Sequence, residues 1–212
     1  MNCYRSFLPG VLLTVALVSG CAHDPLSSAN RASIASVSVN PHVPSPQDIN
    51  YSGPTQAAGG AFGILGVLAT QGAAAGPKDQ LRQTLTQNNI DISHIVADEF
   101  TKQLQEAQLF SNILPEGANA EFKLEVKEYA LISMGISGVL YPYLKVSAQL
   151  ARSDGSVVWK KVDWVSPLNK ANTGGHKLEE FLSHPVLLRD TFQNAGRIVA
   201  KALINNMQES SR

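Results

Sequence analysis

Apolar side chains recur every three to four residues between positions 91 and 110, which predicts an amphipathic helix with one buried stripe. The stripe consists of Ile92, Ile95, Val96, Phe100, Leu104 and Ala107. Asp91 precedes it, where a carboxylate can accept hydrogen bonds from the free N–H groups of the first turn. A second stripe follows Pro185, a residue tolerated in a first helical turn, and runs to Met207. Two long helices with one apolar face each are therefore predicted.

Between these helices the apolar period shortens to two, which indicates strands with one buried face. Residues 121–132 place Phe122, Leu124, Val126, Ala130 and Ile132 on one face and charged residues on the other. Residues 144–150 alternate in the same way. A hairpin signal at 153–156 leads into a third strand at 157–165. Residues 34–39 also alternate, and we expect them to form a first strand.

The remaining segments lack such periods. Residues 40–54 contain four prolines, which predicts an extended connector. Residues 166–175 are a polar loop, and residues 177–182 are expected to add one or two helical turns. Residues 21–33 follow the amino-terminal apolar run and are polar without periodicity, as in a flexible tether.

Two helices and a sheet with one apolar face bury all their stripes only if both helices pack on the same side. We therefore predict an α+β fold, a two-layer sandwich with a mostly antiparallel sheet, formed by a single domain over residues 34–207. The other sheet face would meet solvent or a partner.

Residues 57–76 are an insertion rich in Gly and Ala that carries no charge. In a helix, Gly59 and Gly63 would share a face, as would Phe62 and Gly66, which allows close helix approach. Three interpretations are open: a flexible or loosely helical insertion packed on the domain, a contact for a partner or for self-association, and insertion into a bilayer. The glycines do not match the G-x-G-x-x-G or Walker phosphate loops.

The amino terminus has the layout of an export signal: Arg5, a short apolar run, and small residues before Cys21. The sequence V-S-G-C at 18–21 resembles the lipobox of bacterial lipoproteins. That resemblance implies removal of the signal peptide at 1–20 and acylation of Cys21, with palmitate among the acyl chains. Ala22, in place of Asp, implies the outer membrane, on its periplasmic face.

The full chain holds 17 basic and 17 acidic residues, which disfavours a nucleic-acid partner. Loss of residues 1–20 would remove Arg5 and Cys3, so that no second thiol remains to form a disulfide with Cys21. The fold is expected to be held by packing alone.

The layout of residues 92–207 resembles the small periplasmic α+β domains of envelope lipoproteins. These include the auxiliary lipoproteins of ABC-type lipid transport systems, the lipopolysaccharide-assembly lipoprotein and the amino-terminal domain of the TolB translocation protein. The matching features are a helix ending in Leu109-Phe110, an Ala-rich entry into the strand at 121–132, the hairpin at Asp154-Gly155 and the closing helix. The resemblance implies the fold and the compartment, and no functional residue is carried over.

No catalytic, metal or cofactor site is predicted. His176, Glu180 and His184 are spaced by four, but in a helix the outer two would lie about 12 Å apart, too far to share an ion. Trp159 and Trp164 are an odd number of residues apart in the third strand, so one should face the helices and the other outward. An outward Trp beside Tyr141 and Tyr143 would form a contact patch, unless the loop at 166–175 covers it.

We therefore expect a lipoprotein that is not an enzyme and binds an envelope protein, or a second copy of itself, while the acylated Cys21 holds it to the membrane. One alternative is a lipid or glycan carrier, or enzyme, whose apolar groove is covered by residues 57–76. Another is an oligomer that inserts those residues into the membrane.

Overall fold

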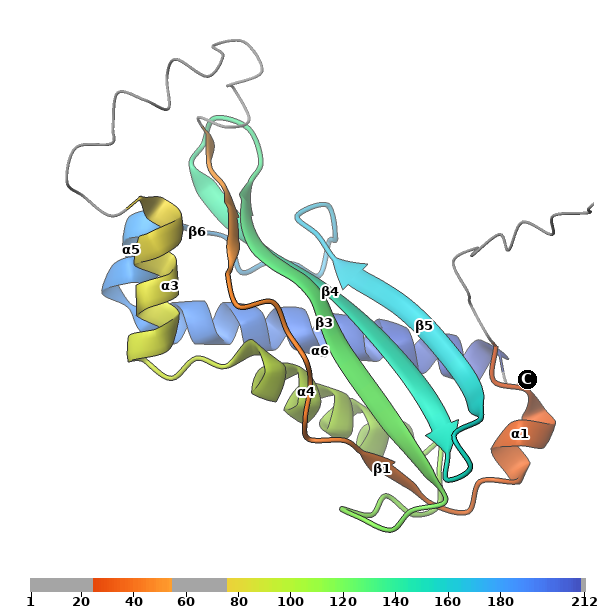
Figure 1. Ribbon diagram of the computed structural model, residues 1–212. Helices are drawn as coiled ribbons and strands as arrows, with labels where there is room; N and C mark the ends of the chain where they lie inside the picture. Colours follow the sequence, from red (N-terminus) through yellow and green to blue (C-terminus); the bar gives the residue numbers. More distant parts are fainter. Residues whose placement is uncertain (1–24, 55–75, 211–212) are drawn as a thin grey trace, which may run out of the picture.

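Strands β3, β4 and β5 form the centre of the structure, a computed structural model that describes residues 25–54 and 76–210 (Figure 1). Cys21, Gly59, Phe62, Gly63 and Gly66 lie outside the described residues, as does most of the predicted insertion at 57–76. The elements are α1 (Ser28–Ala32), β1 (Val37–Val39), β2 (Asn50–Ser52), α3 (Pro77–Gln87), α4 (Ile92–Ala107), β3 (Ala120–Ser133), β4 (Val139–Arg152), β5 (Val157–Val165), β6 (His176–Lys177), α5 (Leu178–Ser183) and α6 (Pro185–Ser210).

The described strands form one mixed sheet in the order β1-β3-β4-β5. The three consecutive strands β3, β4 and β5 are antiparallel, as predicted. The short β1 and β2 pair in parallel with β3, and β6 pairs with β4. The α+β fold class is thus confirmed.

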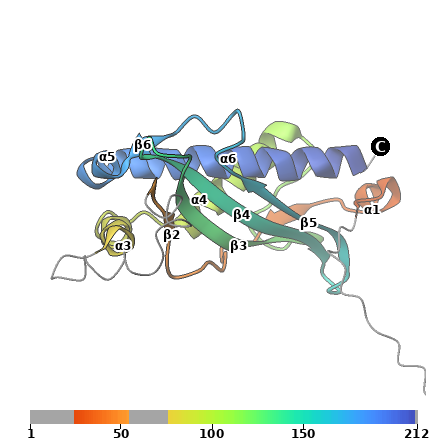
Figure 2. The ribbon, with the colours of Figure 1, turned by 90° about the horizontal axis from the view of Figure 1, so that it is seen from above.

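Helices α4 and α6 cover the same face of this sheet (Figure 2). The Asp91 carboxylate accepts hydrogen bonds from the N–H groups of Ser93 at 2.8 Å and His94 at 3.3 Å, so it caps α4 as predicted. The two helices approach closely at Gly196, where a Cβ atom would lie 3.4 Å from the Cγ2 atom of Ile95. The buried stripes therefore meet each other as well as the sheet.

Phe122 on β3 is the centre of the core. Its ring centroid lies 5.1 Å from that of Phe100, 5.9 Å from Phe110 and 6.2 Å from Trp159, all in edge-to-face geometry. Phe122 and Trp159 are completely buried. One side chain thus connects helix α4, the segment that follows it, and two strands.

A β-bulge in β3 reverses its two faces. Val126 pairs with Val146, but the next partner of β4 is Glu128, so Lys127 is an extra residue. After the bulge Tyr129 and Leu131 join the hydrophobic core, whereas Ala130, although buried, and Ile132 lie outside that core and pair with Tyr143 and Tyr141. The prediction that Ala130 and Ile132 share the face of Phe122 is wrong, because it assumed an uninterrupted strand.

The predicted tether at 21–33 is wrong for the residues from Leu26 onward. Leu26 is buried, and its backbone N–H donates a hydrogen bond to the Ser210 Oγ atom at the end of α6, 3.2 Å away. Ser27 caps α1, a helix too short to show a period in the sequence. The folded body therefore begins only a few residues after Cys21.

Sequence patterns also missed α3, β2 and β6. α3 begins after Gly76, the last residue of the predicted insertion, and buries only Leu81, Thr84 and Leu85. β2 lies within the predicted connector, pairing Asn50 with Ala130. The strand expected at 34–39 is confirmed only for Val37–Val39. The loop at 166–175 and the helices at 177–182 and after Pro185 are confirmed.

Replacing Phe122 with alanine should lower the free energy of unfolding by about 3–5 kcal/mol, because a large cavity would open among three other aromatic rings. Urea unfolding followed by circular dichroism measures this change. The control is Ile136→Ala, at a side chain that is 93% exposed, which should change stability by less than about 0.5 kcal/mol. Equal losses in the two variants would contradict this account of the core.

Candidate functional site

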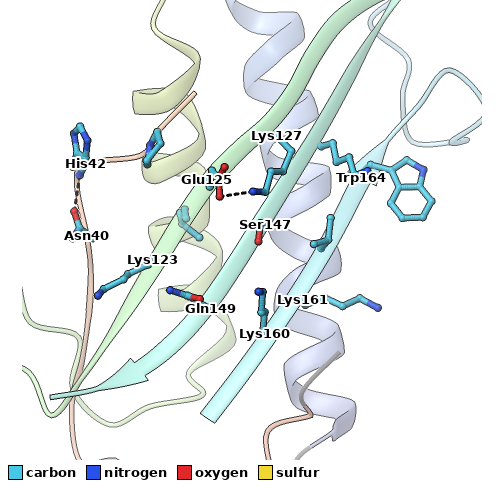
Figure 3. Close-up of a pocket in the computed structure, with 14 residues that line it drawn as sticks. Asn40, His42, Lys123, Glu125, Lys127, Ser147, Gln149, Lys160, Lys161 and Trp164 are labelled. Atoms are coloured by element: carbon cyan, nitrogen blue, oxygen red, sulfur yellow. Dashed lines mark hydrogen bonds and ion pairs between the residues drawn. The ribbon is translucent and has the colours of Figure 1, made fainter. Parts of the chain in front are cut away.

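The face of the sheet turned away from α4 and α6 carries polar and charged side chains in ordered rows. The register of β3, β4 and β5 defines the rows across the strands. They are Lys123–Gln149–Lys160, then Glu125–Ser147–Val162, then Glu128–Lys145–Trp164. We call this surface the outward face (Figure 3).

The outward face is hollowed into a groove of about 900 Å³. Residues 40–44 form one wall, because they run beside β3 and are fixed to it by backbone hydrogen bonds. The Asn40 N–H donates to the Phe122 carbonyl at 2.9 Å, and the Val126 N–H donates to the Pro44 carbonyl at 2.9 Å. Trp164 of β5 lines the groove on its other side (Figure 3). The groove therefore depends on segments that are far apart in the sequence.

The groove is electropositive. Its lining includes Lys123, Lys127, Lys145, Lys160 and Lys161 but only one carboxylate, Glu125, in a chain whose formal net charge is zero. Lys127 pairs with Glu125 at 2.6 Å, and Lys123 lies 3.8 Å from Glu121. Within the described residues, Lys145 and Lys160 form no ion pair. Glu128 lies opposite Lys145 in the register but forms no ion pair with it, so both ammonium groups are available to an anion.

The two tryptophans lie on opposite sides of β5, as their parity predicts. Trp159 is completely buried against Phe122 and cannot contact a partner. Trp164 is 52% exposed and lies opposite Lys145 in the register. Of the two, only Trp164 remains a candidate contact residue.

Tyr141 and Tyr143 share the outward face, but the loop at 166–175 reaches their end of β4. The Asn172 side-chain amide donates hydrogen bonds of 2.9 Å to the carbonyls of Pro142 and Ser166, which holds the loop on the strand. The Tyr141 ring packs against Gly175, where a Cβ atom would overlap it. Burial, and then the charge of Glu128, raises the pKa of Tyr143. The loop thus covers part of Tyr141, and the contact patch of Trp164, Tyr141 and Tyr143 stays a prediction, with Trp164 as its most exposed member.

The histidines considered for a metal site are far from this groove in the sequence and make local contacts. His176 Nδ1 lies 3.2 Å from a Glu180 carboxylate oxygen. The same carboxylate accepts a hydrogen bond from the backbone N–H of Lys177, which lowers the pKa of Glu180. His184 contacts the Ser183 hydroxyl at the end of α5. In the part of the chain that the structure describes, no three metal-binding side chains gather at one point.

None of the helices in the described residues has the length and apolar character needed to cross a bilayer. No protein-family model matches the chain, and no curated protein is significantly similar to it in sequence.

Several solved structures share a distant likeness. Protein XCC0632 from Xanthomonas campestris is 12% identical, with a TM-score of 0.42 over 93% of this chain and 95% of that one. A PelC dodecamer from Paraburkholderia phytofirmans is 13% identical, with a TM-score of 0.40 over 90% and 94%. Lipoprotein GNA1162 from Neisseria meningitidis is 21% identical, with a TM-score of 0.25 over 72% and 95%. At these values the likenesses carry no argument about the role of this chain.

The sequence analysis missed the lysines of the groove. Lys145 and Lys160 lie on the outward side of their predicted strands, and this alternation was the available signal. Their meeting with Lys123 and Trp164 depends on the strand register and on the wall at 40–44.

Gly175→Ala should destabilise the fold by about 1–3 kcal/mol, because the added methyl group would displace the Tyr141 ring. In a Tyr141→Ala background Gly175→Ala should destabilise the fold less, since the ring that the methyl group would displace is absent. Thermal unfolding of the two single variants and the double variant measures this coupling. Gly76→Ala is the control, because a Cβ at Gly76 meets no atom within 4 Å. Additive effects would show that Tyr141 does not pack on Gly175.

Proposed function

We propose that the protein is a lipoprotein of the bacterial envelope that binds another envelope component through its outward face, without catalysing a reaction. The observation that carries this proposal is the electropositive groove that holds the exposed Trp164. The V-S-G-C sequence supports acylation at Cys21, and Ala22 supports the outer membrane, with the domain in the periplasm.

The fold explains why this face is free to bind. The inward apolar side chains of β3, β4 and β5 are buried under α4 and α6, and the backbones of β3 and β4 are paired with strands on both sides. The outward side chains can therefore serve recognition with little effect on the core. Large aromatic side chains concentrate binding energy at interfaces. Trp164 is exposed and surrounded by lysines, which is a suitable centre for such an interface.

The anchor is tested by Cys21→Ser. Wild-type protein should incorporate radiolabelled palmitate and sediment with the outer membrane. The variant should incorporate no label and should be recovered in a precursor form, because the serine hydroxyl is a much weaker nucleophile than the thiol. Label retained by the variant, or wild-type protein in the inner-membrane fraction, would contradict the corresponding part of the proposal.

The binding face is tested by a photo-crosslinking residue at position 164 in living cells. We expect a discrete adduct there, because Trp164 is exposed in the groove. The matched control places the same residue at Lys201, an exposed position on α6 in the layer on the other side of the sheet. No adduct at position 164, or the same adducts at both positions, would count against the outward face as the interface.

A further inference from the structure

We propose that the groove of the outward face binds a linear acidic glycan, with a sugar ring against Trp164 and acidic groups beside Lys145 and Lys160. This inference rests on the proposed function, because it names the ligand of the same face.

Charge selects an anionic ligand. Lys123, Lys127, Lys145 and Lys160 face the groove with one lining carboxylate, Glu125, whereas Lys161 lies opposite Ala148 on the other side of β5. Within the described residues Lys145 and Lys160 have no ion-pair partner. An anion beside either ammonium group would gain charge-assisted hydrogen bonds, which are stronger than neutral ones. A neutral or cationic ligand would gain nothing from these ammonium groups.

The spacing of the rows favours an extended ligand with repeated charges. Gln149 and Lys145 are four residues apart on β4, and Lys160 and Trp164 are four residues apart on β5. Four residues of a strand span about 13 Å. The row of Lys160 and the row of Lys145 are therefore separated by about that distance. A single small anion cannot contact both rows, whereas a chain with repeated acidic groups can.

The floor of the groove is suited to hydroxyl groups. Ser147 lies between the two basic rows and Gln149 lies in the row of Lys160, and neither side chain makes a hydrogen bond among the described residues. A hydroxyl and an amide can each donate and accept, as sugar hydroxyls do. Trp164 adds an apolar ring face, on which the C–H face of a pyranose can stack. Lysines, an amide, a hydroxyl and one exposed ring together match a charged sugar chain.

Two other polyanions fit less well. A bilayer surface is broad and flat, and it would not enter a groove bounded by residues 40–44 and Trp164. An acidic peptide is commonly bound by adding a strand to a free sheet edge. The outer edge of β5 has no strand partner among the described residues, but the groove lies on the face of the sheet rather than along that edge. A peptide within the groove would therefore have side-chain contacts alone.

The experiment uses the full lipidated chain in a non-ionic detergent, with hexagalacturonate as the acidic glycan. The protein has two tryptophans, and only Trp164 is exposed, so bound sugar should change the emission of Trp164 while Trp159 stays constant. We expect saturable binding that weakens as NaCl is raised. The neutral cellohexaose should bind at least about tenfold more weakly than hexagalacturonate.

Lys145→Gln and Lys160→Gln should each raise the dissociation constant about tenfold, because each removes one charge-assisted hydrogen bond. Trp164→Phe should abolish the fluorescence change, and calorimetry should show that it weakens binding less than Trp164→Ala does. Lys102→Gln with Lys201→Gln is the matched control, since both lysines are exposed on the helices, and binding should be unchanged. Circular dichroism checks that every variant is folded.

Three results would overturn the inference: equal binding of hexaglutamate, full competition by vesicles containing phosphatidylglycerol, or unchanged affinity in the Lys145 and Lys160 variants. The crosslink at position 164 separates this inference from the proposed function. A protein adduct without glycan binding would refute the glycan and leave the proposed function standing. If neither an adduct nor glycan binding is observed, both the glycan inference and the proposed function are refuted.

Discussion

Burial of a single sheet face under α4 and α6 is the constraint on which the rest of the structure depends. The inward side chains of β3, β4 and β5 pack on the two helices, with Phe122 and Trp159 at the centre. The two helices also contact each other at Gly196, so each layer packs on more than one neighbour. Since one face supplies the core, the other face can carry exposed lysines without leaving charges buried.

Long elements could be predicted from the sequence because their periods persist over many residues. α4 and α6 each keep a continuous apolar stripe, the three antiparallel strands alternate over long stretches, and Asp91 is a recognisable N-cap of α4. Short elements could not be predicted, because they form only where the chain pairs with a residue far away in the sequence. β2 exists where Asn50 meets Ala130, and β6 where His176 meets Leu140. The bulge at Lys127 shows the same limit within a long strand, since one extra residue reversed the faces of Ala130 and Ile132.

In the candidate site, too, some features could be predicted from the sequence and others could not. The parity of Trp159 and Trp164 was sufficient to predict that one is buried and the other exposed. The groove itself could not be predicted, because it requires the register of three strands and the hydrogen bond from Asn40 to the Phe122 carbonyl. The loop at 166–175 was predicted as a loop, but its position over Tyr141 follows from the bonds of Asn172.

The contact between Leu26 and Ser210 bears on how the molecule is oriented. Five residues span at most about 18 Å, so an acylated Cys21 would hold this end of the domain close to the bilayer. Arg152 lies at the same end, because its guanidinium donates hydrogen bonds to Asn30 and Ser33 near α1. The turn between β3 and β4, with the exposed Ile136, lies at the opposite end of strands that are roughly 45 Å long (Figure 1). With so short a connection to an acylated Cys21, the long axis of the sheet would point away from the membrane. A chain bound along the groove would then run away from the membrane surface rather than parallel to it.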